Sequence, residues 1–142
     1  MTAGVMLETG THFDVSVYQH VVVKIQRGFA TPDELRELVR LQQSLSDIVG
    51  VPWVVCHDGI VIEQRAPGGT MQRVNHLLSY EVRDHARAEE QRILAKIAER
   101  GFRLSDRSSQ NIIVEPETGE THLIDFVNLY RHDEQTEAWR LP

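Results

Sequence analysis

The chain has 142 residues, of which 41% are hydrophobic and 25% are charged, and its formal net charge is -6. This length and composition predict one globular domain with a core of its own. The acidic balance and the lack of a basic run argue against a nucleic-acid partner, because binding to phosphates needs a concentrated basic surface. The sequence has neither an apolar run near about 18 residues nor a signal-peptide pattern, so we expect a soluble protein without a membrane partner. Its single cysteine, Cys56, excludes an internal disulfide and suits a reducing compartment.

Residues 5–26 contain three β-prone runs, which predict a meander of three antiparallel strands. The turn between the first two runs carries Gly10, which we interpret as a plain hairpin glycine. The third run, Val-Val-Val-Lys-Ile-Gln, has Lys24 in its middle, although only two of the 15 basic residues are lysines. From the pattern alone, the Lys24 side chain either points to solvent, as alternate residues of a strand do, or belongs to a functional site.

The segment Thr-Pro-Asp-Glu at 31–34 predicts the start of a helix. Threonine is a preferred N-cap, proline suits the first helical position, and Glu34 completes a capping box. A stripe of leucines then continues to about residue 46. Glu37 has no capping role, so it is either a solvated carboxylate paired with Arg36 or Arg40, or a residue available to a site.

Residues 53–64 predict two strands joined at His57-Asp58-Gly59, because Asp-Gly between β-prone runs is a strong hairpin signal. The second strand is followed by the pair Gly68-Gly69, which indicates either an ordinary loop after an edge strand or a hinge between two parts of the chain. We expect a short helix after Thr70 and a long helix from about residue 80 to residue 100, ended by Gly101.

The stretch from Gly101 to Phe126 places three oxygen-bearing side chains around two short apolar runs. Asp106 lies in a loop, Asn111 opens the first run, and Asp125 lies in the second. The turn formers at 115–120 predict an antiparallel hairpin. Centred on that loop, the hairpin would place Asn111 opposite Asp125, at about 5 Å between Cβ atoms. This separation suits two oxygen ligands of a hard divalent cation.

Taken in order, these patterns resemble the protein-kinase-like superfamily. Asp-x-x-x-x-Asn and Ile-Asp-Phe are similar to the HRDxxxxN and DFG segments, and Val-Val-Val-Lys is similar to the VAIK strand. The most similar forms are the small atypical RIO-like kinases and the minimal effector kinases that some bacteria secrete, which lack an activation segment.

The resemblance implies an α+β, minimal bilobal protein-kinase-like fold in a single domain, residues 1–142. The N-terminal lobe, about residues 1–66, would hold an antiparallel sheet with one helix. The truncated helical C-terminal lobe, residues 67–142, would carry the catalytic hairpin. In the sixteen residues after Phe126, we expect one or two helical turns at 133–140, with Trp139 packed against the lobe.

The resemblance also implies a role for each candidate residue. The catalytic pair would be Asp106, which orients the attacking hydroxyl, and Lys24, which contacts the ATP phosphates. Glu37 would be the ion-pair partner of Lys24. The metal ligands would be Asn111 and Asp125, holding Mg²⁺ or Mn²⁺.

The nucleotide would contact further residues. Gly10 stands in the place of the phosphate-loop glycines, and Ile62 would be the gatekeeper behind the adenine. The backbone of Glu63, Gln64 and Arg65 would hydrogen-bond the adenine edge.

Three hypotheses about function follow from this resemblance. The first is an ATP-dependent phosphotransferase, a kinase of the Ser/Thr type, that modifies a hydroxyl acceptor on a protein and depends on a protein substrate or an activating partner. It would act in the cytoplasm or, as a bacterial effector, inside a host cell. The second is a pseudokinase, a nucleotide-binding or protein-interaction module, favoured by four departures from the motifs: Leu104, Ser105, Ser108 and Val127. A kinase-fold transferase of another group is a third and lower option.

Overall fold

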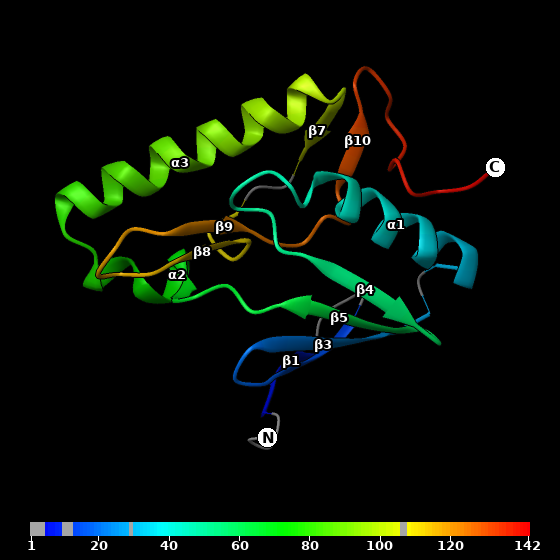
Figure 1. The fold of residues 1–142 in the computed structure, drawn as a ribbon, viewed down its shortest axis with the longest axis horizontal. Helices are drawn as coiled ribbons and strands as arrows, with labels where there is room; N and C mark the ends of the chain where they lie inside the picture. The colour runs from blue at the N-terminus through cyan, green and yellow to red at the C-terminus, as the bar shows by residue number, and fades with distance from the viewer. Residues whose placement is uncertain (1–4, 10–12, 29, 106–107) are drawn as a thin grey trace.

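The computed structural model describes residues 5–9, 13–28, 30–105 and 108–142 of the chain. The described elements combine one larger antiparallel sheet, two small sheets and three α-helices, which confirms the predicted α+β class (Figure 1). In chain order they are β1 (Val5–Thr9), β2 (Phe13–Val17), β3 (Val21–Gln26), α1 (Pro32–Leu45), β4 (Val54–His57), β5 (Ile60–Gln64), β6 (Gly69–Thr70), α2 (Met71–Val74), a 3₁₀ turn (Asn75–Leu77), α3 (Tyr80–Glu99), β7 (Phe102–Leu104), β8 (Ile112–Val114), β9 (Thr121–Leu123) and β10 (Leu129–Arg131).

The five-stranded sheet has the order β1-β2-β3-β5-β4, and every neighbouring pair is antiparallel. Its first three strands are the predicted meander. The β4–β5 hairpin turns at Asp58 and Gly59, whose φ angles of 49° and 77° are both positive. Two positive φ angles match a two-residue turn of the type that Asp-Gly favours. The sequence prediction for this hairpin is therefore confirmed.

Helix α1 begins as the sequence predicts. The Thr31 side chain accepts a hydrogen bond from the Glu34 amide, and the Glu34 carboxylate accepts one from the Thr31 amide, each at 3.1 Å. This reciprocal pair satisfies two backbone donors that the helix itself leaves open. The buried residues of α1, which include Leu35, Leu38 and Leu45, then face the core.

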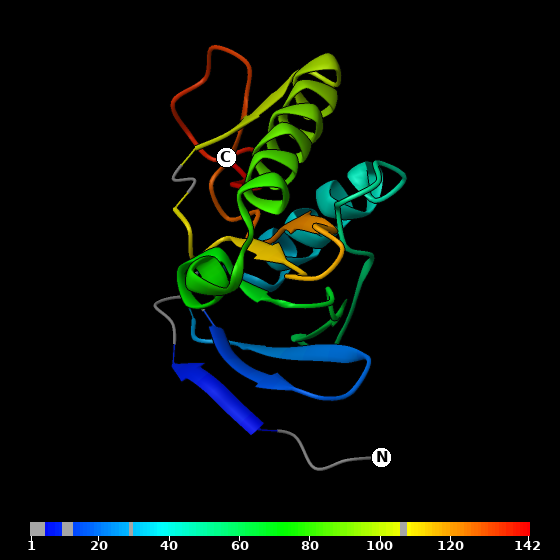
Figure 2. The same ribbon diagram turned by 90° about the vertical axis from the view of Figure 1, so that its left-hand side faces the viewer.

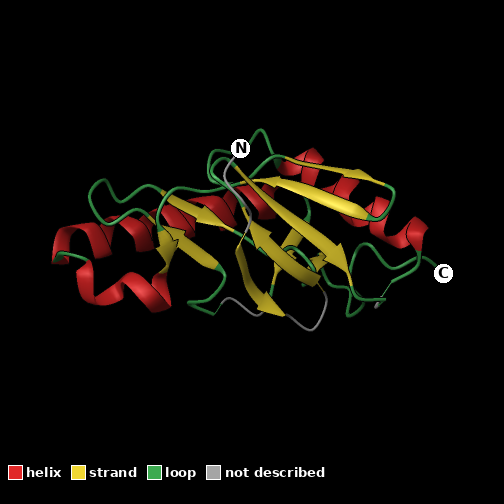
Figure 3. Ribbon diagram, turned by 90° about the horizontal axis from the view of Figure 1, so that it is seen from below, coloured by secondary structure: helices red, strands yellow, loops and turns green. Residues whose placement is uncertain are grey.

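One face of the five-stranded sheet packs against α1, and the other face lacks such a cover among the described residues. Viewed from below, the strands lie in front of the helices (Figure 3). Ile25, Val55 and Ile60 on that open face are each between 41% and 52% exposed. The side chains that alternate with them point toward α1, so this inner face is where the sheet can contribute to a site.

The second half of the chain is organised by α3 and the β8–β9 hairpin. Ala86, Ile93 and Ile97 of α3 are fully buried. Gly101, which follows the last turn of α3, has a positive φ angle of 85°. Gly50, which precedes β4, approaches α3 so closely that a Cβ there would collide with Ile93. Figure 2 shows β1–β3 at one end of the molecule and α3 at the other, with α1 and the hairpin between them. A single buried cluster joins the two halves.

The β8–β9 hairpin exists as predicted, but its register differs by one residue. Ile112 pairs with Leu123 and Ile113 with His122, so the expected Asn111–Asp125 pairing is wrong. The physical reason is burial, because this register turns Ile112 and Leu123 together toward the core, and a slip of one residue would turn them outward. The strand ends at Leu123, and Asp125 has a left-handed backbone with φ 67°.

No helix forms at 133–140, where we expected helical turns, and the segment after Phe126 forms strand β10 before that range. β10 pairs with β7, and the chain then turns without a helix through 133–140. Trp139 is nonetheless fully buried, as predicted, and its Nε1 donates to the Val127 carbonyl at 2.8 Å. The Leu141 amide donates to the Glu34 carboxylate at 3.2 Å, so the tail closes onto the start of α1.

Candidate functional site

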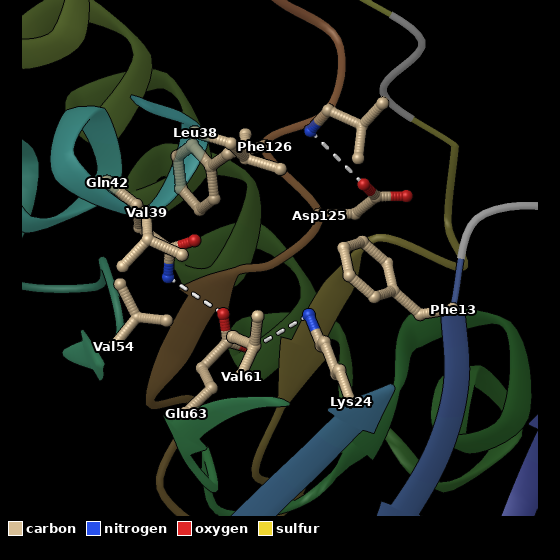
Figure 4. Close-up of a pocket in the computed structure, with 11 residues that line it drawn as sticks. Phe13, Lys24, Leu38, Val39, Gln42, Val54, Val61, Glu63, Asp125 and Phe126 are labelled. Carbon is tan, nitrogen blue, oxygen red and sulfur yellow. Dashed lines mark hydrogen bonds and ion pairs between the residues drawn. The ribbon is translucent and has the colours of Figure 1, made fainter. Parts of the chain in front are cut away.

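A cleft lies between the inner face of the five-stranded sheet, α1 and residues 125–127 after β9 (Figure 4). It brings together candidates from both halves of the sequence, since Lys24 of β3 and Asp125 both line it. The ring of Phe13 lies between these two side chains (Figure 4). The cavity itself measures about 20 Å³, which is close to the space of one water molecule.

The amine of Lys24 is held inside this cleft. Its Nζ lies 3.1 Å from Oε2 of Glu63 and 5.9 Å from the centre of the Phe13 ring. The lysine side chain is only 17% exposed, and the glutamate side chain is 4% exposed. The solvent-facing alternative for Lys24 is therefore wrong, because the side chain points to the helix side of the sheet.

The ion pair differs from the one we expected. Glu37 was the predicted partner of Lys24, but Glu37 instead accepts two hydrogen bonds from Arg40, one turn further along α1. The hydrogen bond and charge of Arg40 lower the pKa of the Glu37 carboxyl, with a smaller contribution from the charge of Arg131. The local i,i+3 pair satisfies Glu37 on the helix surface, and this corrects the predicted role.

Glu63 places its side chain in the cleft, a position that the sequence analysis did not predict. We expected its backbone to meet adenine, whereas its side chain enters the cleft and both carboxylate oxygens are engaged. Oε2 faces Lys24, and Oε1 accepts a hydrogen bond of 2.7 Å from Nε2 of Gln42 on α1. A signal was available, since an acidic residue inside the apolar run Ile-Val-Ile-Glu needs a partner if it is buried. The identity of that partner depends on strand pairing, which no local pattern specifies.

The other residues predicted to surround adenine, Ile62 before Glu63 and Gln64 and Arg65 after it, also differ from expectation. Ile62 pairs with Val23 and Val55 on the open face of the sheet, so it does not line the cleft, and Val61 does. The Gln64 amide donates to the Trp53 carbonyl at 2.9 Å. The Arg65 amide donates to the His20 carbonyl at 3.1 Å. Both backbone donors are thus occupied by the protein's own carbonyls.

The metal-ligand candidates lie at the mouth of the hairpin. Asp125 is half-buried, and its Oδ1 accepts a hydrogen bond of 3.3 Å from the Val127 amide. Asn111 is also half-buried, and its carbonyl accepts from the Ile124 amide at 3.0 Å. This bond places the backbone of Asn111 next to the residue that precedes Asp125. Within the described part of the chain, no cluster of three or more His, Cys, Asp or Glu side chains is arranged as a metal site.

Two predicted site residues, Asp106 and Gly10, lie outside the described residues. Leu104, which stands two positions before Asp106, is buried and belongs to β7. Among the described residues, no helix combines the length and apolarity that crossing a membrane requires.

The sheet, its one packed helix and the second half of the chain with its hairpin make up a minimal bilobal kinase-like fold. Solved structures of WbdD share this fold. A crystal structure of monomeric WbdD has a TM-score of 0.66 at 18% identity, over 84% of this chain and 33% of that chain. A structure of the bifunctional kinase-methyltransferase WbdD has a TM-score of 0.65 at 18% identity, over 84% and 30% of the two chains.

A co-crystal structure of WbdD with the kinase inhibitor LY294002 has a TM-score of 0.58 at 17% identity, over 89% of this chain and 33% of that chain. This chain therefore spans about a third of the length of these WbdD structures. No protein-family model and no curated protein matches the sequence. The likeness defines the fold.

Proposed function

We propose that this protein is an ATP- and Mg²⁺-dependent phosphotransferase that binds the nucleotide in the cleft between the five-stranded sheet and residues 125–127. The observation that carries the proposal is the meeting of Lys24 and Asp125 in one cleft, each supplied by a different half of the chain. One cation and one carboxylate on opposite walls match what the phosphates and their metal ion need.

The chemistry of the donors supports this proposal. Phosphoryl transfer asks the protein mainly for positioning and charge neutralisation. The Lys24 ammonium suits the α and β phosphates. The Asp125 carboxylate and the Asn111 amide are oxygen donors of the kind that Mg²⁺ or Mn²⁺ takes beside phosphate oxygens. The metal ion would neutralise phosphate charge, while Asp106 would orient the acceptor hydroxyl.

The size of the cleft sets a condition on the proposal. A cavity of about 20 Å³ cannot admit an adenine ring. Binding therefore requires the Phe13 ring to turn away from the space between Lys24 and Asp125, or the two halves to separate. We expect nucleotide binding to be accompanied by such an opening.

The fold of WbdD, a bifunctional kinase-methyltransferase that has been crystallised with a kinase inhibitor, supports a nucleotide site in this fold. A protein hydroxyl as the acceptor, Ser/Thr specificity and an activating partner belong to the same proposal. The proposal also includes a relationship to RIO-like and effector kinases and a location in the cytoplasm or in a host cell.

Transfer of label from γ-³²P-ATP to a generic protein acceptor such as casein tests the proposal. We expect transfer by the wild-type protein with Mg²⁺ and a loss of at least about 100-fold in Lys24→Ala and Asp106→Ala, since each removes a group that acts in the transition state. The matched control is Lys96→Ala, because Lys96 is the second lysine and lies 53% exposed on α3. Equal transfer by all four proteins would contradict the proposal.

The second candidate function is a pseudokinase. It is favoured by the occupied backbone donors of Gln64 and Arg65 and by the burial of Val127, which stands in place of the DFG glycine. A rise in melting temperature with Mg-ADP, without label transfer to any acceptor, would support this module over the enzyme. No response to Mg-ADP would contradict both nucleotide-dependent functions.

A further inference from the structure

Lys24 and Glu63 belong to adjacent strands of one sheet. In the β3–β5 ladder, Lys24 pairs with Val61 and Val22 pairs with Glu63, so Lys24 and Glu63 are diagonal neighbours on the same face. Diagonal neighbours lie about 7–8 Å apart in the backbone, which long side chains can bridge. The ladder therefore fixes both ends of the 3.1 Å ion pair.

The carboxylate of Glu63 is also fixed from the other side. Gln42 of α1 donates from Nε2 to Glu63 at 2.7 Å and to the Pro52 carbonyl at 3.1 Å. Gln42 and Glu63 are 5% and 3% exposed. A buried carboxylate with both oxygens engaged has little rotational freedom, because each alternative position leaves a buried charge without a partner.

The acidic residues of α1 are all engaged elsewhere. Asp33 pairs with Arg36, Glu34 closes the capping box, and Glu37 pairs with Arg40. The helix therefore contributes a neutral amide, from Gln42, to the group that holds Lys24. This is the reverse of the arrangement in protein kinases, where the helix supplies the glutamate and its position controls activity.

We propose that Glu63 of β5 is the positioning residue for Lys24, so that the lysine is aligned for the phosphates without any inward movement of α1. This inference rests on the proposed function. Since both charges are carried by strands of one sheet, a displacement of α1 would remove the Gln42 hydrogen bond and leave the ion pair in place. Control of the site by the position of α1, as in regulated kinases, is thereby lost.

Three variants, Glu63→Gln, Gln42→Glu/Glu63→Gln and Glu37→Gln, and a matched control test the inference through the affinity for Mg-ATP, measured by titration calorimetry. Glu63→Gln keeps the shape and removes the charge, and Gln42→Glu/Glu63→Gln returns one negative charge to the same pair of positions. We expect Glu63→Gln to weaken binding by roughly 10- to 100-fold, which corresponds to one charge-assisted hydrogen bond. The double variant should bind more tightly than Glu63→Gln. Glu89→Gln, which removes the 2.6 Å partner of Arg92 on α3, should match the wild type.

A second readout follows the lysine itself. With only Lys24 and Lys96 in the chain, lysine-labelled protein gives two side-chain NMR signals, and Lys96 serves as an internal reference. We expect Glu63→Gln to move the Lys24 signal alone and the double variant to move it back toward its wild-type position. A purely structural role for Glu63 would not give this rescue.

Three outcomes would overturn the inference. Wild-type affinity in a folded Glu63→Gln variant would show that Lys24 needs no acidic partner, while the proposed function would stand. A loss in Glu37→Gln as large as that in Glu63→Gln would return the positioning role to α1. Absence of Mg-ATP binding in the wild-type protein would reject the proposed function, and this inference with it.

Discussion

The five-stranded sheet and the β8–β9 hairpin both carry side chains to the cleft, but they hold them by different means. The sheet positions Lys24 through ladders with long strands on both sides and through a buried ion pair. The hairpin strands have three residues each, and Asp125 lies beyond the end of the second. Asp125 is therefore positioned by what packs around it and much less by its own strand.

The C-terminal tail provides much of that support. Trp139 donates to the Val127 carbonyl at 2.8 Å, and the Val127 amide in turn donates to the Asp125 carboxylate at 3.3 Å. The Ala138 amide adds a bond of 2.7 Å to the Leu129 carbonyl. One wall of the cleft is built into a sheet, whereas the other depends on the C-terminal tail, whose Trp139 lies 12 positions after Val127.

The largest expected effect is that of Trp139→Ala, which removes a fully buried indole from beside Val127. We expect a loss of about 3–5 kcal/mol in the free energy of unfolding, the usual cost of emptying such a site in a core. For a domain of this size, the melting temperature should fall by on the order of 10 °C. Thermal unfolding followed by circular dichroism measures this change.

Trp53→Ala is the matched control on the sheet side. Trp53 is 44% exposed, so its replacement by alanine should lower the free energy of unfolding by roughly 0.5 kcal/mol. Equal losses in the two tryptophan variants would show that the tail does not support the second wall, and the contrast between the two regions would fail.

The parts of the fold that the sequence predicts well are those decided by neighbours in the chain. The capping box of residues 31–34, the turn at Asp58-Gly59 and the helix stop at Gly101 all involve residues within a few positions of one another. Because the interacting groups are adjacent in sequence, their chemistry is visible as a pattern. Lys24 and Asp125 became candidates for the same reason, because each belongs to a motif of a few adjacent residues.

The parts that could not be predicted depend on contacts between distant segments. The partner of Lys24 is Glu63, 39 positions away (63 - 24), and only the β3–β5 register brings them together. The predicted hairpin register was wrong by one residue, because burial of Ile112 and Leu123 in the core outweighed the symmetry of the loop. β10 was missed because its partner, β7, lies before the hairpin.

Glu63, the observed partner of Lys24, and Glu37, the expected one, should differ in how much they stabilise the fold. Glu63→Ala leaves the largely buried ammonium of Lys24 without its partner, so we expect a loss of about 2–3 kcal/mol in the free energy of unfolding. This loss is smaller than for a fully buried pair because the Lys24 side chain is 17% exposed. Glu37→Ala removes the partner of Arg40, whose side chain is 59% exposed, and should cost about 0–1 kcal/mol. Urea unfolding of both variants measures the difference. A larger loss in Glu37→Ala would mean that α1, and not the sheet, carries the ionic support.

The smallest expected effect is a difference in pH dependence between the two regions. His122 of β9 is buried and its Nδ1 has no hydrogen-bond partner among the described residues, whereas His20 and His57 of the sheet side are exposed. Burial lowers the pKa of His122 below its ordinary value of 6.5, and the charge of Glu120 offsets part of this. Below that pH the unfolded chain takes up a proton that the folded ring resists, so stability falls as the pH falls through 6.5.

Replacing the imidazole ring of His122 by an apolar ring should remove this loss of stability at low pH. We expect His122→Phe to lose less stability than the wild type between about pH 7.5 and pH 5. Carboxylates with lowered pKa values, such as Glu34 and Asp47, are present in both proteins and cancel in the comparison. Parallel curves for wild type and His122→Phe in urea unfolding would show that the hairpin carries no buried titrating group, and the pH sensitivity would then lie elsewhere in the chain.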